Sequence, residues 1–172
     1  ELPRRNKPVV CAVNGLAVGG GFEIALAAEF VVAAEHAEFF LPEAGLGIIP
    51  DTGAVRLPRI LPPAVATEVL IGGRRLDARE AERWGLVNQV VPVADLRAAA
   101  LELAGRISAS APLAVEAVLA IDRATRHLSL EEAFTHLRSG DLEAYERMLA
   151  SEDAQEGLQA FVEKRDPHWQ GF

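Results

Sequence analysis

The chain has 172 residues, which is enough for one well-packed core with an extension but short for two independent domains. Hydrophobic residues make up 50% and charged residues 24%, a globular balance, and no apolar run reaches the roughly 20 residues that span a bilayer. The net charge of −8 argues against a nucleic-acid partner, because non-specific binding of that kind depends on neutralising phosphates. We therefore expect a globular protein that binds neither nucleic acid nor membrane.

The N-terminal segment does not resemble a secretion signal. Residues Glu1 to Pro8 are charged and lack both an apolar centre and a small-residue cleavage site. The single cysteine, Cys11, cannot form an internal disulfide, which fits a reducing cytosol, and its apolar neighbours predict core packing. We expect a cytoplasmic protein. Because the chain has no initiating Met and opens within what reads as structure, we also expect a fragment of a longer product.

The first half of the chain alternates short strands with short helices. In chain order, we expect a strand at residues 7–13, a helix at 22–28, strands at 30–34 and 37–41, helices at 64–70 and 78–84, and a strand at 86–93. Pro50-Asp51-Thr52-Gly53 predicts a turn. Asp77 is placed to cap the helix that ends before Gly85. This alternation predicts an α/β fold with local crossovers.

After about residue 93 the strand signal stops. Amphipathic helices are expected at residues 94–109, 113–127, 130–149 and 152–165. Ser129 and Glu132 form a capping box at the start of the third. We therefore divide the chain into an α/β core at 1–93 and an all-α region at 94–172. Amphipathic helices that follow a compact unit bury their apolar faces on something, so we expect self-association through this region.

The glycine run Gly19-Gly20-Gly21 precedes Glu23 at the start of a predicted helix. Glycines let the backbone approach a ligand closely, and the first N–H groups of a helix are unpaired and carry the positive end of its dipole. Such groups stabilise an oxyanion. A tight turn and a capping carboxylate remain the alternative interpretation of the same residues.

Glu43 follows twenty residues after Glu23, between Leu41-Pro42 and the glycines at positions 45 and 47. The flanking proline and glycines constrain the loop conformation. Two carboxylates in different environments are what general acid–base chemistry at neutral pH requires. The alternative is an ordinary glutamate in a surface loop.

Taken together, these motifs resemble those of the enoyl-CoA hydratase/isomerase family, also called the crotonase superfamily. The resemblance is carried by residues 19–23, 41–47, 50–53 and 79–88, and matching stretches run from Lys7 to Arg165. It implies the C-terminal portion of a crotonase-like ββα spiral core, followed by an all-α oligomerisation region. Three further stretches, at 21–28, 59–64 and 163–169, are similar to dehydratases of this family.

The resemblance implies that the substrate is an acyl-CoA thioester and that water is added reversibly across its α,β double bond. Gly20 matches the glycine whose backbone N–H is one of two donors to the thioester oxygen. Glu23 matches the carboxylate that positions and activates water at the β-carbon, and Glu43 the one that exchanges a proton with the α-carbon. Because both acids are present, hydratase chemistry is favoured.

Other residues are assigned to substrate binding by the same resemblance: Gly19, Pro42, Leu46, Asp51 and Lys164. Lys164 matches a lysine that reaches the coenzyme A of a neighbouring subunit, although a solvated cation at a helix C-terminus explains it equally well. Asp51 stands where common hydratases carry glycine and dienoyl-CoA isomerases carry a working aspartate. A Pro-Asp-x-Gly turn accounts for Asp51 without catalysis.

No metal or redox cofactor is expected, since coenzyme A is part of the substrate and the four histidines share no metal-ligand spacing. The resemblance implies a homo-oligomer, either a trimer or a pair of trimers. Family members begin with a further stretch that holds the second oxyanion donor and most coenzyme A contacts. Two alternatives remain open: an enoyl- or dienoyl-CoA isomerase that uses Asp51, and a truncated, inactive chain that only oligomerises.

Overall fold

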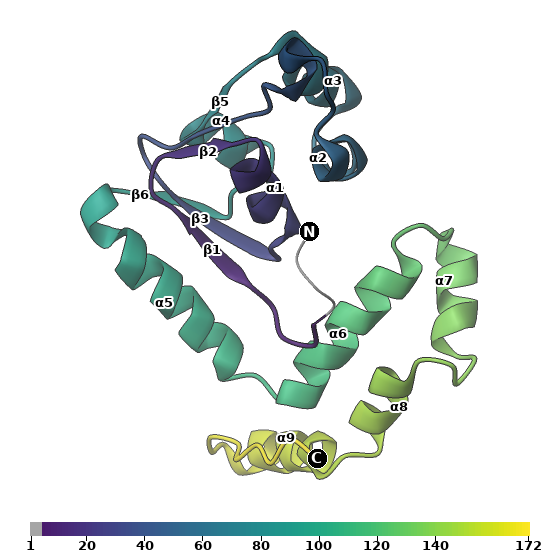
Figure 1. The fold of residues 1–172 in the computed structure, drawn as a ribbon. Helices are drawn as coiled ribbons and strands as arrows, with labels where there is room; N and C mark the ends of the chain where they lie inside the picture. The colour runs from purple at the N-terminus through teal and green to yellow at the C-terminus, as the bar shows by residue number, and fades with distance from the viewer. Residues whose placement is uncertain (1–4) are drawn as a thin grey trace. The chain divides into compact units, whose positions relative to one another are not determined.

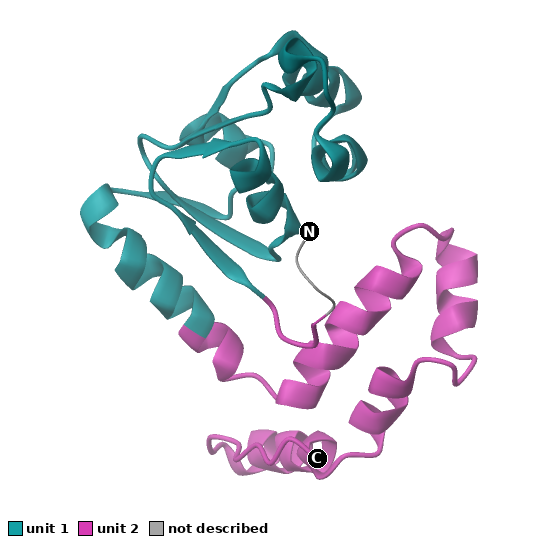
Figure 2. Ribbon diagram, in the orientation of Figure 1, with its two compact units in different colours: residues 1–4, 9–104 teal, residues 5–8, 105–172 magenta. Residues whose placement is uncertain are grey.

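The computed structural model describes residues 5–172, which divide into two compact units (Figure 2). The first unit contains residues 9–104, and the second contains residues 5–8 and 105–172. The division falls inside helix α5, Leu96–Ser108. The domain boundary expected after residue 93 stays a prediction.

Two small sheets form the frame of the first unit (Figure 1). One sheet is parallel throughout and has the order β1 (Val10–Val13), β3 (Phe30–Ala34), β6 (Gln89–Val91). The other has the order β2 (Leu16–Val18), β4 (Glu38–Phe40), β5 (Leu76–Asp77). In this second sheet β2 and β4 run parallel, while β5 is antiparallel to β4. The α/β class expected from the sequence is confirmed.

The first four strands alternate between the two sheets, and helical segments follow β2 and β4. Helix α1 (Gly20–Ala27) follows β1 and β2. After β3 and β4 come the 3-10 turn η1 (Glu43–Leu46), helix α2 (Asp51–Arg56), the 3-10 turn η2 (Leu57–Arg59) and helix α3 (Pro63–Gly72). Because β2 and β4 are parallel and paired to their last residues, Val18 opposite Phe40, the segments that follow them leave the sheet at the same edge. This edge carries both the glycine run and Glu43.

The main core of the first unit lies around Phe22 and Phe39, whose ring centroids are 5.4 Å apart in a tilted arrangement. Both rings are fully buried, which explains why α1 holds its position above β4. Cys11 is partly buried against this core, as predicted. Burial raises the pKa of the Cys11 thiol, so the thiol stays protonated and contributes packing.

Helix α4 (Ala78–Arg83) confirms the predicted cap. The Asp77 side chain accepts a hydrogen bond from the Glu80 N–H at 2.7 Å, which satisfies one of the unpaired donors at the helix start. Among residues 5–172, no single helix is long and apolar enough to cross a bilayer; only residues 93–108 and 112–125 taken as a bent pair reach that length and composition.

One expectation for the first unit is wrong, and the short strands β2 and β5 were not expected. The turn predicted at residues 50–53 is the beginning of α2, in which Pro50 is the N-cap and its carbonyl accepts from the Ala54 N–H at 2.7 Å. Proline before an acidic residue suits a helix N-terminus as well as a turn, and the buried position of Gly53 decides for the helix. Strand β2 was also missed, because three residues between turn signals carry too short a pattern and only pairing with β4 makes them a strand.

The second unit is built from helices. Its members are α6 (Pro112–Thr125), α7 (Leu130–Leu137), α8 (Glu143–Leu149) and α9 (Glu152–Glu163). Helix α6 packs on both α7 and α8, and Arg147 of α8 forms an ion pair with Glu116 of α6. The capping box of Ser129 and Glu132 is present at the start of α7, as predicted.

The single helix expected at residues 130–149 is wrong, because the chain breaks between α7 and α8. Gly140 adopts a φ of 80°, a left-handed conformation that a helix cannot contain. The Ser139 hydroxyl accepts a hydrogen bond from the Asp141 N–H at 3.1 Å and supports the break. Ser139, Gly140 and Asp141 all disfavour a helix interior, so the helix breaks at these residues although the pattern on either side is amphipathic.

Replacing Gly140 with Ala is expected to lower the free energy of unfolding by about 1–2 kcal/mol, because a β-carbon is disfavoured at positive φ. Urea denaturation measures this change. Gly105→Ala in α5 is the matched control: a β-carbon there meets no atom within 4 Å, and alanine favours a helix interior. Equal stability of the Gly140→Ala variant and the parent would contradict the assigned break.

Candidate active site

The glycine run is held in place by the sheet that precedes it. The Gly19 N–H donates to the Phe40 carbonyl at 3.1 Å, which continues the pairing of β2 with β4 by one residue. Helix α1 then begins at Gly20, and the Gly19 carbonyl accepts from the Glu23 N–H at 2.9 Å. The turn from strand to helix is therefore completed within a single residue.

Gly20, the predicted oxyanion donor, is the first residue of α1 and is exposed. Its N–H has no partner within the helix, since the first N–H groups of a helix lack a carbonyl four residues earlier. The positive end of the helix dipole reinforces this donor. The position fits a site for a negatively charged oxygen.

Glu23 lies one turn into α1 and is half-buried. Its Oε1 accepts a hydrogen bond from the Gly53 N–H at 2.8 Å, and Gly53 belongs to α2. The carboxylate is thus fastened to a helix other than its own. Glu23 does cap a helix, as one interpretation of the sequence allowed. The helix that it caps is α2, however, and not its own helix α1.

Glu43 is the first residue of η1, two residues beyond the buried Leu41, and it is half-buried in a 3-10 turn where a loop was expected. A β-carbon on Gly19 would lie 2.5 Å from Glu43 Oε1, so only glycine allows this carboxylate to come so near α1. Its Oε2 is buried and has no hydrogen-bond partner among the described residues. Burying a carboxylate oxygen without a hydrogen-bond partner costs free energy of folding. Such an oxygen is suited to accept a proton from a ligand or to donate one to it.

These contacts bring three of the predicted site residues to one place. The helix start at Gly20 offers an oxyanion donor, Glu43 lies against the preceding glycine, and Glu23 follows on the same helix. A fixed N–H donor beside two carboxylates with different surroundings is an arrangement for moving protons while negative charge develops on an oxygen.

The predicted substrate-binding residues fall into two groups. Pro42 is the half-buried N-cap of η1, Leu46 ends that turn with 72% of its surface exposed, and the exposed Asp51 opens α2. These residues lie in the first unit with the glutamates. Lys164 belongs to the second unit.

The sequence did not identify Gly53 as a site residue. As the last position of a predicted turn, Gly53 had no expected chemical role. As the third residue of a helix that begins after Pro50, it is a position where another group can approach the backbone closely. The partner of Gly53 lies 30 residues away in the sequence, so no local pattern reveals the contact.

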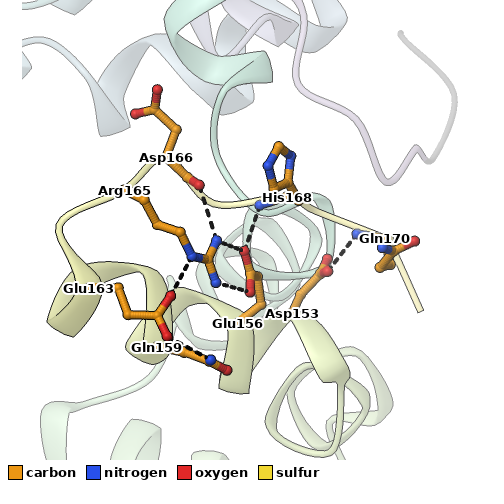
Figure 3. A network of polar contacts seen from close by, with 8 residues as sticks. All are labelled: Asp153, Glu156, Gln159, Glu163, Arg165, Asp166, His168 and Gln170. Carbon is orange, nitrogen blue, oxygen red and sulfur yellow. Dashed lines mark hydrogen bonds and ion pairs between the residues drawn. The ribbon is translucent and has the colours of Figure 1, made fainter.

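Lys164 ends α9 in a left-handed conformation with a φ of 56°, and it is the one non-glycine residue with positive φ among residues 5–172. The neighbouring Arg165 is held by two carboxylates (Figure 3). It donates to both oxygens of Glu156 at 2.6 and 2.8 Å and to Glu163 at 2.6 Å. These ion pairs turn the chain back, and they explain why α9 ends at Glu163 and not at the expected residue 165.

The rest of the C-terminal segment is fastened to the same helix. The His168 N–H donates to Glu156 at 2.8 Å, and the buried Asp153 accepts from the Gln170 N–H at 2.6 Å (Figure 3). Asp153 also accepts from the Gly171 N–H at 3.0 Å. Trp169 donates its indole N–H to the Ala109 carbonyl at 2.8 Å. Hydrogen bonds from Arg165 and then from His168 lower the pKa of Glu156 to about 2.

Comparison with known proteins places this geometry in context. Residues 1–171 match the family model described as enoyl-CoA hydratase/isomerase. The chain is 56% identical over 172 residues to a carnitinyl-CoA dehydratase of Salmonella arizonae and 57% identical to one of Citrobacter koseri. In both cases the match covers 99% of this chain and 66% of the relative, so the chain spans just under two thirds of the relatives' length.

Solved structures give the same result. The enoyl-CoA hydratase of Bacillus anthracis is 40% identical, with a TM-score of 0.89 over 97% of this chain and 64% of that one. The enoyl-CoA hydratase of Mycobacterium tuberculosis is 38% identical, with a TM-score of 0.89 over 97% and 65%. The resemblance inferred from the sequence, including the dehydratase stretches, is confirmed.

We expect Glu156→Gln to remove an acid-sensitive attachment of the C-terminal segment. The folded-state pKa of Glu156, about 2, lies below its ordinary value of 4.5. Ionised Glu156 therefore stabilises the segment above about pH 4.5, and this contribution is lost as the pH falls towards 2. Fluorescence of Trp169 in a Trp84→Phe background, followed from pH 7 to 2, measures the detachment.

In the Glu156→Gln variant the signal should already resemble the acid form at pH 7. Glu152→Gln, an exposed change in the first turn of the same helix, is the control and should keep the parental profile. If both variants titrate as the parent does, Glu156 does not hold the segment.

Proposed function

Since this chain belongs to the enoyl-CoA hydratase/isomerase family, we propose that the protein is an acyl-CoA hydratase or dehydratase that adds or removes water across the α,β double bond of an enoyl-CoA thioester. The observation that carries this proposal is the placement of Glu23 and Glu43 beside the helix start at Gly20. Two carboxylates and one oxyanion donor match the needs of that reaction.

The oxyanion donor addresses the charge that the reaction creates. Moving a proton to or from the α-carbon of a thioester places enolate charge on the thioester oxygen. The Gly20 N–H donates to that oxygen where the charge develops, and losing one such donor typically costs about 2.7–4 kcal/mol. The dipole of α1 acts in the same direction.

The two glutamates divide the remaining steps. In hydration, Glu23 accepts a proton from water as the water oxygen bonds to the β-carbon, and protonated Glu43 gives a proton to the α-carbon. Dehydration runs through the same steps in reverse. The unpartnered Oε2 of Glu43 suits an acid that exchanges its proton with a ligand atom, while the anchored Glu23 suits the positioning of a water molecule.

We propose the carnitinyl-CoA/crotonobetainyl-CoA pair as the substrate, because curated relatives at 56–57% identity are named carnitinyl-CoA dehydratases. Gly19, Pro42 and Leu46 contribute to the thioester site in this proposal, and the exposed cation Lys164 meets the coenzyme A of a neighbouring subunit. Coenzyme A is part of the substrate, and the reaction uses no separate metal or redox cofactor.

A second candidate is an enoyl- or dienoyl-CoA isomerase that uses Asp51. It is favoured by one observation: Asp51 is exposed and lies two residues before Gly53, which contacts Glu23. The product separates the two candidates, because a hydratase yields a hydroxyl group and an isomerase only moves the double bond.

We further propose that residues 1–93 are the C-terminal portion of a crotonase-like core, and that 94–172 form an all-α oligomerisation region in a cytoplasmic trimer or hexamer. Helix α9 supports this assembly with a row of exposed apolar side chains, Leu158, Phe161 and Val162, which are 73%, 84% and 79% exposed. Their spacing of three and four residues places them on one helix face.

Two amide substitutions test the assigned chemistry. Glu43→Gln keeps the shape of the side chain but removes the base, so exchange of the α-proton with solvent should be abolished while thioester affinity changes less than about threefold. Glu23→Gln should suppress hydration more than α-proton exchange. Deuterium exchange into the α-position of carnitinyl-CoA and hydroxyl formation on crotonobetainyl-CoA measure the two steps separately. Normal deuterium incorporation in Glu43→Gln would contradict its role, and the opposite pattern would reverse the two assignments.

The assembly is tested by replacing Phe161 with Glu. A charge in the centre of the apolar face should shift the protein to smaller species, because a buried unpaired charge is strongly unfavourable. Light scattering after size-exclusion chromatography measures the mass. Gln155→Glu, an exposed polar position on the same helix, is the control. A stable monomer in the parent would contradict self-association, and an unchanged mass in Phe161→Glu would show that this face is not the interface.

A further inference from the structure

The start of helix α2 contacts Glu23, one of the proposed catalytic acids, through a backbone hydrogen bond. The Ala54 N–H makes the first backbone bond of this helix, to the Pro50 carbonyl at 2.7 Å. The Gly53 N–H precedes it and has no carbonyl partner within α2. It donates instead to Oε1 of Glu23 at 2.8 Å, across 30 residues of sequence.

Only glycine permits this contact. A β-carbon at position 53 would lie 2.8 Å from Leu41 Cδ1, 3.2 Å from Pro50 Cβ and 3.6 Å from Glu23 Oε1. Gly53 itself is buried, and Leu41 is 1% exposed, so the surroundings have little room to move. A side chain at this position would crowd Leu41 and Pro50, and a shift of the Gly53 backbone to relieve this would move the amide relative to the carboxylate.

The two glutamates therefore differ in how the protein holds them. Glu23 has one oxygen bound to the Gly53 amide, and its Oε2 accepts no hydrogen bond within residues 5–172. Glu43 has a buried Oε2 that no described donor contacts. Glu23 is oriented by a backbone N–H group, whereas the Oε2 of Glu43 is free to interact with a ligand.

We propose that Gly53 is a positioning residue that assigns Glu23 to water. Its N–H occupies Oε1 and leaves Oε2 as the oxygen that takes a proton from the attacking water, so hydration depends on Gly53 and α-proton exchange does not. This inference rests on the proposed hydratase function. It concerns the orientation of one carboxylate and gives Gly53 no contact with the substrate.

A competing explanation is that Glu23 merely caps α2 and that the contact serves stability alone. The two explanations differ in which step a change at Gly53 affects. Loss of a cap lowers stability and leaves the hydration to exchange ratio unchanged. Loss of orientation lowers this ratio, because a carboxylate displaced by about 1 Å loses on the order of a hundredfold in rate.

The experiment compares Gly53→Ala with the parent in the intact protein, using crotonobetainyl-CoA and crotonyl-CoA as probes of hydration and carnitinyl-CoA in D2O as the probe of α-proton exchange. Hydration should fall by about 10- to 100-fold, with α-proton exchange and KM within about threefold of the parent. Gly15→Ala is the control and should keep the parental rates, because a β-carbon there meets no atom within 4 Å. The thermal unfolding temperature of each variant measures separately how much stability is lost with the helix cap.

A double-mutant cycle shows whether Gly53 acts through Glu23. In a Glu23→Ala background, adding Gly53→Ala should change the residual hydration rate less than about twofold, because the group that Gly53 orients is absent. If Gly53→Ala does not fold, Glu23→Asp replaces it: the shorter acid withdraws from the Gly53 amide, so hydration should fall while exchange persists. Parental hydration in Glu23→Asp overturns the proposal.

The outcomes separate this inference from the function on which it rests. If Glu23→Gln loses hydration but Gly53→Ala does not, the positioning role is wrong and the hydratase assignment stands. If neither variant affects hydration, the role proposed for Glu23 is itself wrong. If Gly53→Ala lowers hydration and exchange equally, the residue supports the whole site and does not orient one acid.

Discussion

The pairing of β2 with β4 is the constraint on which the first unit depends. The two strands are parallel, and the ladder extends one residue further through the hydrogen bond from the Gly19 N–H to the Phe40 carbonyl. Everything that follows β2 and β4 is therefore delivered to one edge of a three-stranded sheet. The helix start at Gly20 and the acid at position 43 lie at this edge because parallel paired strands end on the same side of the sheet.

Two glycines at this edge allow carboxylates to come close to the backbone. At Gly19 the missing side chain admits the Glu43 carboxylate, and at Gly53 it admits a backbone donor to the Glu23 carboxylate. Both acids are thereby held beside the positive end of α1, while their unengaged oxygens differ in surroundings. The proposed reaction uses this difference, since water and the α-carbon require separate proton carriers.

In the second unit, the segment that follows α9 is fastened to that helix by hydrogen bonds and ion pairs. Two acids on α9, Asp153 and Glu156, accept hydrogen bonds from Arg165, His168, Gln170 and Gly171. The left-handed Lys164 marks the reversal. Helix α9 also exposes the apolar face formed by Leu158, Phe161 and Val162, which is the surface proposed for self-association.

The sequence by itself determined the α/β class, the cap at Asp77 and the capping box at Ser129, and it offered the acids at positions 23 and 43 as candidates. The two caps rest on residues within a few positions of one another, where propensity and spacing act directly. Strand β3 was predicted at residues 30–34 and has those bounds, because a run of valine and alanine buried on both faces has no competing pattern.

Only the tertiary structure decided that residues 51–56 form a helix, that β2 exists, and that Gly53 contacts Glu23. It also separated α7 from α8 at Gly140, where a left-handed residue interrupts an otherwise continuous amphipathic pattern. These features depend on groups tens of residues apart, or on one conformation among several that a turn sequence allows. Their energies come from pairing and close packing across the fold, which local sequence does not encode.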